Sequence, residues 1–156
     1  MIQRIQTLFL FLVFATSLAA FFFPIANFFS SPVYTIDLGV LGIREYANYN
    51  AMWPNTILLT IVLGLVALLA FLTIFMYKRR MMQVRLIRFD LLLNIIYLAL
   101  IFFYYVPELE KITQTDADYV GEPGIYLTIV SVAFLILANR SIMKDEKLVR
   151  SADRLR

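Results

Sequence analysis

The chain has 156 residues, of which 62% are hydrophobic, and its formal net charge is +3 with no histidine and no cysteine. A soluble domain contains about 45–50% apolar residues, so this composition indicates a membrane protein. The missing residue types exclude disulfides, thiolate catalysis and Cys- or His-ligated metals. The sequence also shows no phosphate loop and no nucleophile beside a base, so we expect no enzyme, no cofactor, no metal site and no nucleic-acid binding.

The first apolar segment, residues 7–29, follows Arg4 and contains a single internal breaker, Pro24. A secretory signal also begins with basic residues, but its apolar core is shorter, about 7–15 residues, so we expect this segment to be retained as a membrane span. The first outer loop follows at residues 30–55. Its partly alternating stretch at 33–38 precedes two glycines and predicts a small β-hairpin.

Residues 56–77 carry no charge and form the clearest span, which ends at Lys78. The connection at 78–88 mixes five cations with apolar residues and is compatible with a short helix lying against the headgroups. The third span is predicted at 89–106, where Pro107 ends it.

The fourth span is predicted at 125–143 and requires Arg140 to extend its charge toward the inner surface, as long cations near helix ends do. Residues 144–156 have apolar positions on one helical stripe and charges on the rest. This pattern predicts that a cytoplasmic amphipathic helix continues the fourth span.

The cations fix the expected orientation. Twelve of the fourteen Lys and Arg residues fall at the start, in the 78–88 connection or in the tail, and Arg44 and Lys111 are the two exceptions. Because cytoplasmic segments carry the excess of Lys and Arg, both termini are predicted to be cytoplasmic. We therefore expect an all-α membrane protein, a single domain over residues 1–156 built as a four-transmembrane-helix bundle.

Asp90 and Asn94 lie four residues apart in the third span. An acid within a membrane is by default a candidate for a proton or cation site. The structural alternative places Asp90 in the first helical turn, where the helix dipole favours an anion, with Arg85 and Arg88 as partners.

The cytoplasmic cations form a second candidate site, for anionic lipid or for a protein partner. Its residues are Lys78, Arg79, Arg80, Arg85, Arg88, Arg140, Lys144, Lys147, Arg150 and Arg154. In the second outer loop, Asp116, Asp118 and Glu122 suggest either a solvated acidic loop or, with spacing that matches no complete EF-hand, a calcium loop.

Both ends of the chain and the inner connection also carry a resemblance. The start MIQRIQT, the inner Lys78, Arg79 and Arg80 with the residues that follow, and the ending KDEKLVRSADRLR resemble a family of small four-span membrane proteins of Bacteroidota that is described only as a domain of unknown function. The resemblance covers the whole chain. It implies a bacterial inner membrane and a cytoplasmic functional face, and it supplies no activity, substrate or catalytic residue.

Three hypotheses on function follow. The first is a non-enzymatic scaffold or accessory subunit that binds a cytoplasmic or membrane partner through the inner loop and tail. The second is a small transporter, channel or lipid-handling protein that uses Asp90 and Asn94. The third, a membrane enzyme, would need a carboxylate pair or metal site that the sequence does not show.

Overall fold

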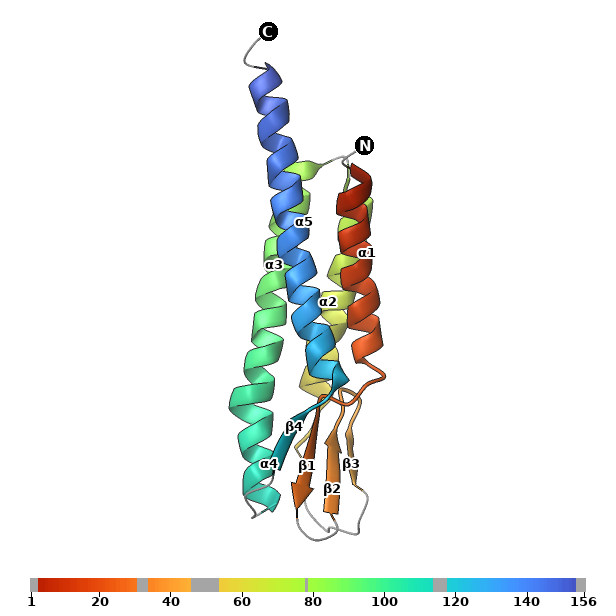
Figure 1. The fold of residues 1–156 in the computed structure, drawn as a ribbon, viewed down its shortest axis with the longest axis vertical. Coiled ribbons are helices and arrows are strands. Elements are labelled where there is room, and N and C mark those ends of the chain that lie inside the picture. Colours follow the sequence, from red (N-terminus) through yellow and green to blue (C-terminus); the bar gives the residue numbers. More distant parts are fainter. Residues whose placement is uncertain (1–2, 31–33, 46–53, 78, 114–117, 154–156) are drawn as a thin grey trace.

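The computed structural model describes residues 3–30, 34–45, 54–77, 79–113 and 118–153. It is mostly helical and elongated, with a small β-sheet at one end (Figure 1). The helices are α1 (Gln3–Ala20), α2 (Ile57–Phe75), α3 (Arg80–Leu100), the π-helical turn η1 (Ile101–Tyr105), α4 (Val106–Thr113) and α5 (Pro123–Asp153). We call the two ends of the molecule the sheet end and the terminus end.

The long helices pack side by side. Helix α1 contacts α2 and α5, and α3 also contacts α2 and α5, so the four surround a shared interior. The expected mostly helical architecture with long apolar helices is confirmed. Within the described residues, three helical segments are long and apolar enough to cross a membrane: Ile57–Phe75, Met81–Ile112 and Pro123–Lys147.

The first predicted span differs from the structure. Helix α1 ends at Ala20 rather than at residue 29, and its apolar part, Ile5–Ala20, is shorter than the other three segments. Pro24 explains the early end, because a proline lacks the backbone donor and disfavours helical geometry at the preceding residue. The apolar residues beyond it pair in a sheet instead of continuing the helix.

The third span also differs from the prediction at both ends. Helix α3 begins at Arg80, so no separate headgroup helix occupies the described part of residues 78–88, and the helix continues past Pro107 to Thr113. The π-helical turn accommodates the proline by widening the backbone just before it, where the Val106 N–H donates to the Ile101 carbonyl. Buried Tyr105 and Leu109 then hold the extension against the sheet end.

The sheet is larger than the predicted hairpin. Strands β2 (Tyr34–Leu38) and β3 (Ile43–Glu45) form that hairpin, which is confirmed. Strand β1 (Ala26–Ser30), from the predicted first span, and β4 (Asp118–Gly121), from the second loop, complete an antiparallel sheet of order β3-β2-β1-β4.

Helix α5 confirms that the fourth span and the tail form one helix. It is continuous for 31 residues, and its blue C-terminal part extends beyond the other helices at the terminus end (Figure 1). The start of the predicted tail is nevertheless part of the bundle, because Asp145 is buried and accepts a hydrogen bond from the Gln6 side chain of α1.

Two buried apolar clusters fill the interior. The sheet-end cluster includes Ala20 of α1, Tyr97 of α3 and Ile125 of α5, together with the inner face of the sheet. The terminus-end cluster includes Leu10 and Val13 of α1, Ala70 of α2, Val84 and Ile87 of α3, and Leu135, Ala138 and Ile142 of α5. Buried polar side chains lie in the stretch between the two clusters.

Gly124 sets how closely α5 approaches the end of α1. Its N–H donates to the Pro24 carbonyl at 2.9 Å. A Cβ on Gly124 would lie 2.5 Å from the Pro24 oxygen and 2.9 Å from the Phe23 oxygen, and both are backbone atoms that cannot move aside alone.

We therefore expect Gly124→Ala to separate the first turn of α5 from the residues after α1. The loss of stability should be about 1–3 kcal/mol, as for other overpacked sites. Thermal unfolding of the purified protein in detergent measures it. The matched control is Gly42→Ala, because a Cβ at Gly42 meets no atom within 4 Å. Equal melting temperatures for the two variants would contradict this role of Gly124.

Candidate functional site

Four buried polar side chains that lie between the two apolar clusters leave at least one polar atom without a hydrogen-bond partner in the described chain. Ser17 belongs to α1, Asp90 and Asn94 to α3, and Ser131 to α5, and each is at most 1% exposed. Along each helix they fall between residues of the terminus-end cluster and residues of the sheet-end cluster. We call these four residues the central polar layer.

Contacts between the helices place the layer in one region of the bundle. Helices α1 and α5 are antiparallel, and the hydrogen bond between the Gln6 and Asp145 side chains relates their helical residues. Ser17 lies 11 residues after Gln6, and Ser131 lies 14 residues before Asp145. At a rise of about 1.5 Å per residue, the two serines therefore stand within about one turn of each other along the bundle.

Helix α3 joins the same level through α2. The Phe14 and Phe71 rings, 5.3 Å apart between centroids, fix α1 against α2, and the Gln83 side chain donates to the Thr73 carbonyl at 3.2 Å. Counting the rise per residue along each helix from these two contacts gives the height of each residue along the bundle. Asp90 and Asn94 then lie within about two helical turns of Ser17. The three helices therefore bring their polar groups to one region.

Asp90 is the most unusual member of the layer. It is 1% exposed, and neither carboxylate oxygen has a hydrogen-bond partner among the described residues. Asn94 is fully buried, and its amide donates to the Asp90 backbone carbonyl at 3.1 Å rather than to the carboxylate. The side-chain carboxylate is left with no donor from the described part of the protein.

Other oxygens of the layer share this lack of partners. The hydroxyls of Ser17 and Ser131, the Asn94 side-chain oxygen and the nearby Tyr97 hydroxyl have no hydrogen-bond partner within the described chain. A buried polar atom without a partner costs about 1–3 kcal/mol. Such a group of atoms indicates a region where a further bound species would gain hydrogen bonds or ligands.

The structural alternative for Asp90 is wrong. Asp90 does not lie in the first helical turn, because α3 begins at Arg80. Arg85 and Arg88 are exposed, and neither forms an ion pair with the Asp90 carboxylate. The capping and pairing that would explain an acid at this position are both missing.

The layer has the chemistry of a site for a small cation or a proton. It offers one carboxylate and several neutral oxygens, which are the ligands that hard cations prefer. A single carboxylate balances one positive charge. Among the described residues no group of three or more His, Cys, Asp or Glu side chains is arranged to hold a metal ion.

The predicted basic residues whose side chains the structure describes do not join this layer. Arg79, Arg85, Arg88, Arg140, Lys144 and Lys147 are exposed. Arg80 and Arg150 lie in α3 and α5, at positions whose side chains fall outside the description, and Lys78 and Arg154 fall outside the described residues. Of the acidic outer loop, Glu122 accepts a hydrogen bond from Asn27 at 2.6 Å, and Asp116 lies outside the described residues.

Sequence reasoning identified Asp90 and Asn94 but not the two serines as part of a site. Ser17 and Ser131 each stand alone in an apolar helix, and serine is common in membrane helices. The sequence offered one weak signal: each serine lies near the middle of its apolar stretch, and Asp90 lies within its own helix once that helix is extended to Arg80. The sequence does not relate the three positions to one another, and only the packing of the helices does.

Comparison with known proteins identifies the family alone. No curated protein and no solved structure matches the chain. The model of one family, described as a domain of unknown function (DUF4293), matches residues 2–155. The expected resemblance to an uncharacterised family is thereby confirmed, and the chain belongs to this DUF4293 family.

Proposed function

We propose that the chain is a multi-pass protein of a bacterial inner membrane that binds a proton or a monovalent cation at Asp90 and moves it across the bilayer. The three long apolar helical segments support membrane insertion. The cations clustered near the start, the 78–88 connection and the tail support cytoplasmic termini. This makes the transporter hypothesis our first choice.

The single observation that carries the proposal is the buried Asp90 carboxylate without a hydrogen-bond partner in the described chain. A charge in a low-dielectric interior is unstable unless it is neutralised or paired. A proton or a bound cation would neutralise it. An acid kept in the interior at such an energetic disadvantage is typical of a functional group rather than a structural one.

Stability measurements separate a functional Asp90 from a structural one. If Asp90 serves binding, then Asp90→Leu removes an uncompensated polar group and should raise the melting temperature in detergent. If Asp90 instead holds the helices together, the same change should lower the melting temperature. A drop in Asp90→Leu would therefore contradict the proposal.

Flux measurements test the ion itself. Proteoliposomes that contain a pH-sensitive dye are given an imposed Na⁺ or K⁺ gradient. With the wild-type protein they should show ion-coupled proton movement or cation flux. With Asp90→Asn this signal should fall to the level of empty liposomes. The matched control is Asp145→Asn, because Asp145 is also a buried carboxylate but has Gln6 as a donor. Equal flux in Asp90→Asn and wild type would reject Asp90 as the ion-binding group.

A second candidate function is a scaffold with a cytoplasmic docking face. It is favoured by the part of α5 that extends past the other helices (Figure 1) and by the exposed Lys144 and Lys147 at its base. The docking segment would then begin after Lys147 rather than at 144, because Asp145 is packed against α1.

Truncation after Lys147 tests this second function without breaking the contact between Gln6 and Asp145. Cross-linking in native membranes followed by mass spectrometry should identify a specific partner with the full chain and lose it with the truncated one. The control is full-length Lys147→Gln, which keeps the helix and removes one charge. The same co-purifying proteins with full-length and truncated chains would contradict a docking role for this segment.

A further inference from the structure

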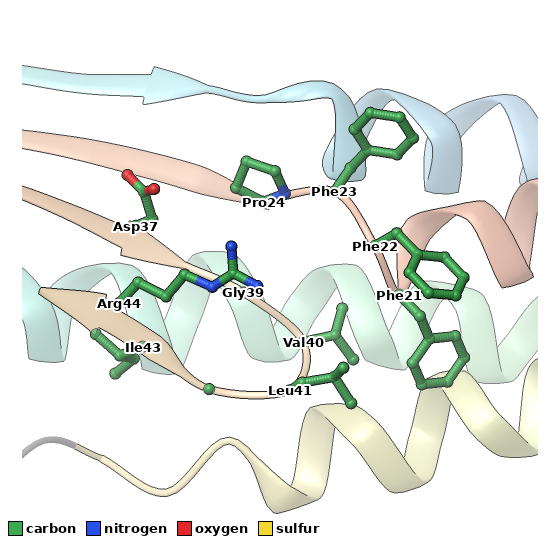
Figure 2. Close-up of a pocket in the computed structure, with 11 residues that line it drawn as sticks. Phe21, Phe22, Phe23, Pro24, Asp37, Gly39, Val40, Leu41, Ile43 and Arg44 are labelled. Carbon is green, nitrogen blue, oxygen red and sulfur yellow. The ribbon is translucent and has the colours of Figure 1, made fainter.

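A cavity of about 510 Å³ lies at the sheet end, away from the central polar layer. One wall is formed by residues 21–24, which follow α1, and the other by the end of β2, the turn after it and β3 (Figure 2). Its volume falls within the range of about 300–1,000 Å³ that small-molecule sites occupy. The cavity therefore has room for a lipid head group.

The end of the cavity nearest the helices is apolar and open, and both walls contribute to it. Phe22 is 82% exposed and Leu41 68% exposed, and Phe23 is also exposed. These side chains lie where α1 ends, and therefore at the boundary between the hydrocarbon layer and the headgroups if the helices cross a membrane. Exposed phenylalanine and leucine at that level would contact acyl chains.

The opposite end of the cavity is charged. Asp37 of β2 and Arg44 of β3 are directly opposite each other in the antiparallel pair, so their side chains belong to the same face of the sheet. No ion pair joins these two described residues. Figure 2 shows the Arg44 guanidinium extending along the cavity toward Gly39, with the Asp37 carboxylate on the neighbouring strand. One positive and one negative group are thus both available to a ligand.

We propose that this cavity binds the head group of a phosphatidylethanolamine molecule. Arg44 binds the phosphate, because a guanidinium forms bidentate hydrogen bonds with phosphate oxygens. Asp37 accepts hydrogen bonds from the ammonium group, and the acyl chains lie along Phe22 and Leu41. The opposite charges of the cavity match a zwitterion better than an anionic lipid. This site is independent of the function proposed for Asp90.

Native mass spectrometry of the purified protein tests the proposal by titration with phosphatidylethanolamine, phosphatidylcholine and phosphatidylglycerol. Wild type should bind phosphatidylethanolamine most tightly. Arg44→Gln should weaken binding of all three by about tenfold, because it removes the charge-assisted contact with the phosphate. Asp37→Asn should remove the preference for ethanolamine over choline, since the choline head has no N–H to donate.

Two controls keep the result interpretable. Lys111 is, with Arg44, one of the two cations outside the predicted cytoplasmic segments. It lies in α4 and does not line the cavity. The Lys111→Gln variant should therefore bind lipid as the wild-type protein does. Arg44→Lys should retain part of the affinity, which shows that the site is folded. Tighter binding of phosphatidylglycerol than of phosphatidylethanolamine, or unchanged binding in Arg44→Gln, would overturn the proposal.

Discussion

The antiparallel contact between α1 and α5 is the constraint on which the rest of the structure depends. It is closed at the sheet end by the approach of Gly124 to the Pro24 carbonyl and at the terminus end by the hydrogen bond between Gln6 and Asp145. With both ends fixed, Ser17 and Ser131 stand within about one turn of each other along the bundle. The same contact carries β4 to the edge of β1, because β4 directly precedes α5 and β1 follows α1.

This arrangement places buried polar groups in the middle of a bundle whose long apolar helices could cross a membrane. Between helices in lipid, packing and hydrogen bonds hold the structure together, because lipid is as apolar as leucine. The two apolar clusters provide that packing on either side of the central polar layer. The layer itself contributes few hydrogen bonds among the described residues, and this lack of partners is what our proposal of a bound proton or cation would account for.

The long apolar helices and the hairpin could be predicted from the sequence because both leave local patterns. The charge-free run at 56–77 and the alternation before Gly39 are such patterns. The end of α1 was misplaced because Phe28 reads as apolar whether it lies in a span or in a buried strand, and its partner Tyr119 is far away in the sequence. Pairing between distant segments has no local signal.

Pro107 and the C-terminal tail were also misjudged because contacts between distant segments leave no local sequence pattern. A proline in an apolar run predicts a helix end, but the π-helical turn before it and the burial of Leu109 allow the helix to continue. Asp145 read as part of a solvated tail, and its contact with Gln6 depends on the register of two helices from opposite ends of the chain. Asp90 could be identified from the sequence as an acid in an apolar segment. That its carboxylate has no hydrogen-bond partner among the described residues could be seen only once the packing of α3 was known.

Chemical modification of Asp90 is the most direct measurement of the central claim. A hydrophobic carbodiimide applied to native membranes reacts with a carboxyl group that is neutral and buried in an apolar region, and peptide mass spectrometry locates the adduct. The account predicts that Asp90 is modified, and that added Na⁺ or K⁺, or a more alkaline buffer, protects it from modification. An unmodified Asp90 under all conditions would contradict the account, as would modification that no cation or proton concentration changes.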